Sequence, residues 1–411
     1  MYQTIFIIIV AILIAEYLVS RVLDYLNSQE RATDLPEELS DIYDMDKYKK
    51  SQEYGKVNSR FALISGSFQL ILVMLMLFMG GFAYFDKIAE GYTSHPVWSA
   101  LIFFGILFFL SDIINTPFSV YSTFVIEEKF GFNKTTVKTF ILDKLKGWLL
   151  TIIIGGGILG FIIWLYFQTT DMFWIYAWIA LSGFSIFMSM FYSNLIVPLF
   201  NKQTPLEDGE LRDAIAKFGE KAGFKIDNIY VINGSKRSSK ANAYFTGLGK
   251  KKRIVLYDTL INDLSINEIV AVLAHEIGHY KLKHTLVSMI LSIIQTGVIF
   301  YILSLFIGNE NLSMALGADN YRFELSLIAF GMLFSPISTI IGLFMNVFSR
   351  KNEYQADNFA KSFGFGDSLI SSLKKLSISS LTNLTPHPAY VFAYYSHPTL
   401  YQRILAIKGK G

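Results

Sequence analysis

Two histidines four residues apart, with a glutamate directly after the first, form the pattern in this sequence with the clearest chemistry. They are His275 and His279 with Glu276, in the run HEIGH. On a helix, residues four apart project from one face, so both imidazoles can bind the same Zn²⁺ ion. Glu276 then lies close enough to take a proton from a metal-bound water. The pattern predicts zinc-dependent hydrolysis of a peptide bond, with one Zn²⁺ per chain.

The residues around HEIGH favour the helix that this chemistry needs. Ser265 and Glu268 have the spacing of a capping box, which begins a helix. Apolar residues recur with a helical period behind the histidines and predict a buried face. They are Ile269, Val270, Val272, Leu273 and Ile277. The alternative is a helix that carries two surface histidines and no metal.

A later acidic pair is the candidate that completes the metal site. Glu353 and Asp357 are four residues apart and would share a helix face. Because a catalytic zinc usually has three protein ligands and one open position, Glu353 is our candidate for the third ligand. Asp357 would accept a hydrogen bond from a ligand imidazole and fix its tautomer. A solvated acidic start of a helix fits the spacing equally well. The chain has no cysteine, so thiolate ligands are excluded.

A short β-capable segment precedes HEIGH by about thirty residues. It consists of Asn242, Ala243, Tyr244 and Phe245. In a zinc protease, an edge strand pairs with the extended substrate backbone and aligns the peptide bond over the metal. An ordinary hairpin strand is equally compatible with the spacing. We also expect a helix at 211–222 and strands at 229–232 and 254–257.

Charged residues outside HEIGH support weaker hypotheses. His397 or Arg403 would stabilise an oxyanion if either reached the site, but they are six residues apart and share no helix face. Basic clusters at 236–240 and 250–253 would attract anionic lipids or would only keep the segment soluble. Nothing in the sequence indicates a nucleic-acid-binding module.

The composition indicates a membrane protein. The chain is 52% hydrophobic and 17% charged, whereas soluble domains are about a quarter charged. Seven apolar runs have about the length of a membrane-spanning helix. They are residues 2–22, 61–85, 97–114, 148–167, 173–195, 286–307 and 325–348. The first run lacks a basic start and a cleavage site, so we expect a retained helix rather than a signal peptide. Glu16, Asp112 and Asn115 should face the bundle interior or a wet cavity, and the alternative for Glu16 is a position near enough to the end of its run to reach the interface.

Along the chain, loops that are rich in lysine and arginine alternate with loops that have few of them. This alternation predicts an N-terminus outside, with the zinc motif and the C-terminal tail in the cytoplasm. It also suggests four parts: five membrane helices in 1–198, the cytoplasmic segment 199–285, two more membrane helices in 286–348, and C-terminal cytoplasmic helices in 349–411.

Several of these motifs resemble those of the type I CAAX prenyl proteases, membrane-embedded zinc endopeptidases that act at prenylated C-termini. The resemblance covers most of the chain and keeps the order VIEEKFGFN, KRSSKANAYFTG, RIVLYDTLI, HEIGH, SRKNEYQAD and YSHP. It implies a ring of seven membrane helices around a water-filled chamber, joined to a small α+β zinc-protease domain of gluzincin type. The partners that it implies are a prenylated peptide or protein and the lipid bilayer.

The same resemblance implies a role for each candidate residue. The zinc ligands would be His275, His279 and Glu353, and Glu276 would be the general base. Residues 242–245 would pair with the substrate. Asp357 would support the ligands, and both His397 and Arg403 would approach the reacting carbonyl.

Three other functions compete with CAAX processing. The tail ends in Lys408-Gly409-Lys410-Gly411 and not in a dilysine, which favours a bacterial inner membrane over the endoplasmic reticulum. A membrane-protein quality-control protease without a prenyl requirement is then an alternative. A seven-helix transporter with a structural metal would require paired repeats, and we find none. An inactive binding scaffold would have no use for Glu276.

Overall fold

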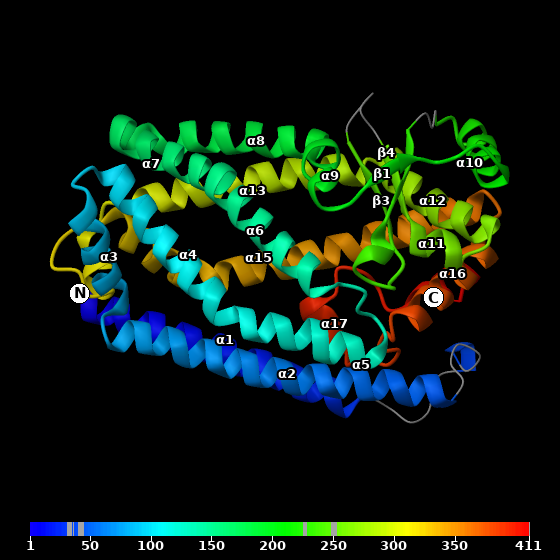
Figure 1. Ribbon diagram of the computed structural model, residues 1–411, viewed down its shortest axis with the longest axis horizontal. Coiled ribbons are helices and arrows are strands. Elements are labelled where there is room, and N and C mark those ends of the chain that lie inside the picture. Colours follow the sequence, from blue (N-terminus) through cyan, green and yellow to red (C-terminus); the bar gives the residue numbers. More distant parts are fainter. Residues whose placement is uncertain (31–34, 36, 40–44, 225–227, 248–252, 411) are drawn as a thin grey trace.

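The computed structural model describes residues 1–411 apart from 31–34, 36, 40–44, 225–227, 248–252 and 411. The long helices run along the long axis of the molecule (Figure 1). A small sheet and several short helices gather at one end of these helices, where the C-terminus also lies. The N-terminus lies at the opposite end.

The second long helix differs from its predicted boundaries, whereas the first agrees with them. Helix α1 (Tyr2–Gln29) matches the first apolar run, but α2 (Met45–Phe78) begins well before the second. The polar residues 45–60 therefore extend a membrane helix beyond its apolar run. The second run ends early because Gly80 has a left-handed backbone with φ 65°, and α3 (Gly81–Tyr92) starts there in a new direction.

The middle of the chain forms helices that continue through π-helical turns. Helix α4 (Pro96–Tyr121) passes through η2 (Ser122–Glu127) into α5 (Glu128–Phe130). In the same way, α6 (Val137–Leu150) passes through η3 (Thr151–Gly156) into α7 (Gly157–Thr169). The remaining helices of this part are η4 (Thr170–Met172), α8 (Phe173–Leu195), α9 (Val197–Phe200), α13 (His284–Phe306), α14 (Glu310–Ala315) and α15 (Phe323–Ser362).

By length and composition, six stretches of the described residues can cross a membrane. They are Tyr2–Gln29, Asp46–Phe78, Pro96–Phe130, Val137–Phe200, His284–Phe306 and Phe323–Ser362. The fourth stretch turns at η4, so that α7 and α8 pack against each other. Its two arms contain the fourth and fifth predicted runs. The helical membrane fold is confirmed, whereas the count of seven and the enclosed chamber stay predictions.

The polar residues inside the apolar runs have partners on neighbouring helices. Asp112 on α4 accepts hydrogen bonds from Lys144 at 2.8 Å and from Trp148 at 2.9 Å, both on α6. Asn115 accepts a hydrogen bond from Gln69 on α2. Glu16 on α1 accepts one from Ser335 on α15 at 2.7 Å. Each contact therefore joins two membrane helices, as expected for polar groups that face the bundle interior.

The sheet has four short strands in the order β1-β2-β4-β3. They are β1 (Gln203–Pro205), β2 (Ile229–Ile232), β3 (Ala243–Thr246) and β4 (Arg253–Tyr257). Strands β2 and β4 are parallel, and the other two pairs are antiparallel. The predicted strands at 229–232 and 254–257 are confirmed. Strand β3 lies at the edge of the sheet, with one side unpaired among the described residues.

Short helices lie around the sheet and the HEIGH segment, and most of them contribute to one apolar core. They are η1 (Glu37–Leu39), α10 (Glu210–Lys221), η5 (Gly234–Lys236), α11 (Asp258–Asp263), α12 (Ile266–Lys281), α16 (Gly366–Ser379), α17 (Pro388–Tyr394) and α18 (Leu400–Lys408). Leu256 of β4, Ile269 of α12 and Ile404 of α18 are all buried in this core. The C-terminal helices thus complete the domain that holds α12.

The first basic cluster attaches this domain to the helical bundle. Arg237 donates two hydrogen bonds to Asp143 on α6, at 2.7 and 2.8 Å. Lys240 donates to Glu127 in η2 at 2.9 Å. From the sequence, we expected these cations either to attract anionic lipids or only to keep the segment soluble. Neither prediction describes them, because both cations are ion-paired within the protein. Residues 250–252 of the second cluster lie outside the described residues.

Candidate metal centre

Helix α12 holds HEIGH in the predicted conformation. The capping box is present, since the Ser265 side chain and the Glu268 side chain each bond the other's backbone N–H. Glu268 also accepts hydrogen bonds from Lys375 at 2.7 Å and from Ser371 at 2.6 Å, both on α16. The apolar face behind the histidines is buried. The start of the helix is therefore fixed both locally and by α16.

Gly278, the glycine of HEIGH, allows α12 to approach α15 closely. A Cβ atom at this position would lie 3.2 Å from the Cα atom of Ala356 and 3.2 Å from Phe359. These distances are tighter than ordinary contacts, and the Ala356 atom belongs to the backbone. Because α15 also carries Glu353 and Asp357, this close approach brings the two halves of the candidate site together.

Three ligand atoms from α12 and α15 meet at one point. The Nε2 atoms of His275 and His279 are 3.1 Å apart. Glu353 places Oε1 3.1 Å from His279 Nε2 and Oε2 3.4 Å from His275 Nε2. A tetrahedral ion with bonds of about 2.0–2.1 Å separates its ligand atoms by about 3.3 Å. Among the described residues, this is the one group of His and acidic side chains with such a geometry.

An unpartnered oxygen also indicates a metal. Glu353 is buried, and its Oε2 atom has no hydrogen-bond partner among the described residues, although His275 Nε2 and Arg403 Nη1 each lie 3.4 Å from it. A buried carboxylate oxygen without a partner is costly, and a cation at the centre of the cluster would satisfy it. Two imidazoles and one carboxylate are also a donor set that divalent transition metals accept. The residues present therefore fit a metal ion.

Asp357 and Arg403 support His275 from behind. Asp357 Oδ1 lies 2.8 Å from His275 Nδ1, so that the ring donates its Nδ1–H and leaves Nε2 free for a ligand bond. Arg403, on α18, donates two hydrogen bonds to Asp357, one of them 2.8 Å long. Burial lowers the pKa of His275, but hydrogen bonds to Asp357 and Glu353 outweigh burial and raise the pKa to about 9.

The structure also brings His397 to the cluster, although spacing alone did not. Its Nε2 atom lies 3.3 Å from Glu353 Oε1, and 61% of its side chain is exposed. Glu276 follows His275 on α12 and is half-buried. The cluster therefore has an exposed imidazole in contact with it, and a partly exposed carboxylate follows one of its ligands in the chain.

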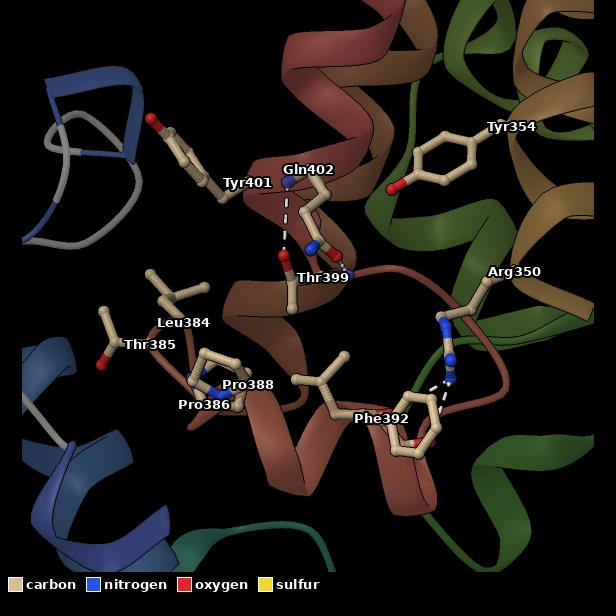
Figure 2. Close-up of a pocket in the computed structure, with 11 residues that line it drawn as sticks. Arg350, Tyr354, Leu384, Thr385, Pro386, Pro388, Phe392, Thr399, Tyr401 and Gln402 are labelled. Atoms are coloured by element: carbon tan, nitrogen blue, oxygen red, sulfur yellow. Dashed lines mark hydrogen bonds between the residues drawn. The ribbon is translucent and has the colours of Figure 1, made fainter. Parts of the chain in front are cut away.

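Arg350 holds the segment that carries His397, and nothing in the sequence indicated this role. It lines a cavity of about 420 Å³ between α15, α17 and the start of α18. Figure 2 shows its guanidinium turned toward Phe392. Arg350 donates to the carbonyl oxygens of Val391 at 3.2 Å and of Tyr395. A cation at the C-terminal end of α17 fixes the turn that leads to His397.

The predicted substrate segment lies beside the metal helix. Strand β3 contacts α12, and the rings of Phe245 and Tyr280 are 5.3 Å apart. Tyr280 directly follows His279. The backbone of Asn242 accepts a hydrogen bond from Tyr257 at 3.1 Å, which extends the pairing of β3 with β4 by one residue. Ala243 and Tyr244 pair with Leu256 and Val255. The free edge of β3 is therefore available for a further strand.

One histidine near the ligands was missed. His284 is buried, and its Nδ1 atom lies 3.1 Å from His279 Nδ1. The sequence did contain a signal. Three of the chain's six histidines, namely His275, His279 and His284, lie within ten residues of one another. The spacing of five from His279 places His284 off the ligand face of a continuous helix, so periodicity alone could not find it.

Comparison with known proteins agrees with this geometry. Residues 205–410 match the family model described as peptidase family M48, and residues 24–202 match the model described as the CAAX prenyl protease N-terminal part with five membrane helices. The chain belongs to the CAAX prenyl protease family of M48 peptidases. It is therefore a membrane metalloendopeptidase.

Similar proteins of this family extend over almost the whole chain. A CAAX prenyl protease 1 homolog of Dictyostelium discoideum is 37% identical over 97% of this chain and 95% of its own length. CAAX prenyl protease 1 of Saccharomyces cerevisiae is 35% identical over 96% of this chain and 93% of its own. The crystal structure of S. mikatae Ste24p superposes with a TM-score of 0.94 at 35% identity, over 98% of this chain and 99% of that one.

Proposed function

We propose that this family member is a zinc endopeptidase that cleaves near the C-terminus of prenylated CAAX-type substrates. The observation that carries the metal assignment is the set of three ligand atoms 3.1–3.4 Å apart, with an unpartnered Glu353 oxygen among them. The donor set of two histidines and a glutamate is one that catalytic zinc uses. The names of the relatives, CAAX prenyl protease 1 and its homologs, support the substrate class.

The side chains around the ligands would divide the work of hydrolysis. Bound zinc would activate a water and polarise the scissile carbonyl. Glu276 would accept the proton of the attacking water and deliver it to the leaving amine. His397 would donate a hydrogen bond to the oxyanion, because its side chain is exposed beside Glu353.

Arg403 has a different role in this proposal from the one that the family resemblance implied. The residue is buried, with 8% of its surface exposed, and its guanidinium is held by both oxygens of Asp357. We therefore assign it to the support of Asp357 and, through Asp357, of His275. His397 is then the better candidate for contact with the reacting carbonyl.

The free edge of β3 would hold the substrate backbone. A substrate strand that pairs with residues 242–245 gains main-chain hydrogen bonds without regard to its side chains. Because β3 packs on α12, such a strand would pass along the metal helix. This role explains why a four-residue strand ends the sheet without a further partner among the described residues.

The membrane orientation remains part of this proposal. Lysine and arginine placement supports a cytoplasmic active site with the N-terminus outside. The relatives reported above come from eukaryotes, so they add no support to the bacterial inner membrane, and we favour the endoplasmic reticulum. Membership in a peptidase family removes the transporter and the inactive scaffold as leading alternatives.

A matched pair of peptides tests the substrate class. The purified full-length protein is incubated with a prenylated CAAX peptide and with its unprenylated twin, with Glu276→Gln as the control variant. We expect rapid cleavage of the prenylated peptide alone. Equal cleavage of both peptides would favour the quality-control alternative, and equal turnover by Glu276→Gln would contradict the mechanism.

A further inference from the structure

A second support, formed by the buried His284 and the exposed Gln355, lies behind the other ligand histidine. His284 Nδ1 lies 3.1 Å from His279 Nδ1, and His284 Nε2 lies 2.8 Å from Gln355 Oε1. Only 7% of His284 is exposed. Gln355 belongs to α15, between Glu353 and Asp357. The chain His279–His284–Gln355 therefore connects the two helices that supply the metal ligands.

A tight turn places His284 in this position. Helix α12 ends at Lys281 and α13 begins at His284, and Lys283 between them has a left-handed backbone with φ 62°. This conformation is uncommon for a residue with a side chain. The turn ends α12 and redirects the chain, so that the first residue of α13 faces back toward His279. A continued helix would have carried His284 around the axis and away from that ring.

The hydrogen bonds determine which nitrogen of His279 is free. The Oε1 atom of Gln355 accepts, so His284 donates from Nε2 and has an unprotonated Nδ1. That Nδ1 atom accepts from His279, which must then donate Nδ1–H and keep its lone pair on Nε2. His279 Nε2 is the atom 3.1 Å from both His275 Nε2 and Glu353 Oε1. The arrangement thus presents a lone pair to the metal position.

We propose that His284 is a positioning residue that fixes the tautomer and the ring orientation of His279 for metal binding. This inference rests on the proposed metal function and adds a support to it. The two ligand imidazoles then have unlike partners: a carboxylate held by Arg403 behind His275, and a neutral imidazole held by Gln355 behind His279. Partners of this kind commonly change metal affinity about 10- to 100-fold when they are removed.

Four variants of the full-length protein test the chain of hydrogen bonds. His284→Leu removes the acceptor, and His284→Asn keeps one near the position of Nδ1. Gln355→Leu removes the last link, whereas Gln355→Glu keeps an oxygen that can only accept. His95→Leu replaces an exposed histidine far from the site and serves as the matched control.

Zinc affinity is measured by competition with a chelator, and the absorption spectrum of the Co²⁺-substituted protein reports the ligand geometry. We expect His284→Leu to weaken zinc binding about 10- to 100-fold and to alter the Co²⁺ spectrum. His284→Asn and Gln355→Glu should keep most of the zinc affinity of the unmodified chain. The zinc affinity of Gln355→Leu should lie between theirs and that of His284→Leu. His95→Leu should bind zinc as the unmodified chain does.

The thermal unfolding of each metal-free variant separates positioning from general packing. If His284→Leu lowers the metal-free unfolding temperature but binds zinc normally once folded, the residue is structural and the inference is wrong. Equal losses of affinity in His284→Asn and His284→Leu would also contradict it. Failure of the unmodified protein to bind zinc would overturn the proposed function itself, so the two outcomes are distinguishable.

Discussion

At the scale of single residues, the site depends on which atoms of each side chain are free. His275 and His279 turn their Nε2 atoms toward Glu353, and each has its Nδ1 atom in contact with another side chain. Glu353 is a candidate ligand and Glu276 is not. Substitutions of these two residues should therefore affect metal affinity and catalysis separately.

Glu276→Gln tests the catalytic half of this separation. The amide has nearly the shape of the carboxylate but cannot accept a proton from water. We expect peptide cleavage to fall about 10²- to 10⁴-fold, the range for loss of a general base. The zinc content, measured by metal analysis of the purified protein, should stay at one ion per chain.

Glu353→Ala tests the metal half. Removal of one of three protein ligands should lower the bound zinc well below one ion per chain. Activity should be lost at ordinary zinc concentrations. Undiminished zinc in this variant would remove Glu353 from the ligand set.

At the scale of elements, the geometry depends on how α12 meets α15 and α16. Gly278 lets the α12 backbone approach Ala356, and Glu268 holds the first turn of α12 against α16. The Gly278 contact lies within HEIGH, and the Glu268 contact lies at the start of α12. Each can be altered without a change in any proposed ligand.

Gly278→Ala should separate the ligands on α12 from Glu353. The added Cβ meets backbone and ring atoms at 3.2 Å, so the helices must move apart. Overpacking of this kind costs about 1–3 kcal/mol. We expect a lower unfolding temperature and weaker zinc binding in chelator competition. Gly183→Ala, in a helix where a Cβ meets nothing within 4 Å, is the matched control.

Glu268 should make the stability of the domain depend on acid pH. Burial raises the pKa of its carboxyl, but hydrogen bonds from Lys375, Ser371 and Ser265 outweigh burial and lower the pKa to about 2. A lowered pKa stabilises the fold above the unfolded value of 4.5, and this stabilisation is lost as the pH falls from 4.5 toward 2. Unfolding temperatures measured from pH 7 to pH 3 should show this loss.

Glu268→Gln is the variant that isolates this effect. It keeps a capping oxygen but removes the charge, so it should be less stable at pH 7 by roughly 2–3 kcal/mol. Its unfolding temperature should also change less between pH 5 and pH 3 than that of the unmodified chain. An equal pH dependence in both proteins would contradict the assignment.

At the scale of the whole molecule, the catalytic domain is built from distant parts of the chain and is attached to the membrane helices. Helix α15 runs for 40 residues from the bundle to the metal ligands. Arg237 ties the loop before β3 to Asp143 on α6 with two hydrogen bonds, and both side chains are less than a quarter exposed. The substrate strand and the bundle are therefore coupled.

A double-mutant cycle on Arg237 and Asp143 measures that coupling. We expect Arg237→Ala and Asp143→Ala each to lower stability, with a coupling energy of about 1–3 kcal/mol between them. Additive effects of the two substitutions on the unfolding temperature would show that the contact does not join the two parts.

Sequence patterns predicted the elements of this protein well where one physical rule decided the outcome. Seven apolar runs indicated a helical membrane protein, the spacing of Ser265 and Glu268 began α12 correctly, and HEIGH lies on that helix. Two strands were placed within one residue of their observed bounds. These features depend on hydrophobic period, length and local hydrogen bonds, which a sequence displays directly.

The tertiary structure decided which distant residues meet. Spacing could not bring Glu353, 74 residues after His279, or His397 to the histidines, whereas the structure places both within 3.4 Å of a ligand atom. The role of Arg350 was invisible for the same reason, and that of His284 was marked only by its closeness to the other two histidines, because each acts across a contact between helices. HEIGH by itself thus determined the chemistry that its residue types allow. The packing of α12, α15 and α18 decided which other side chains complete the site.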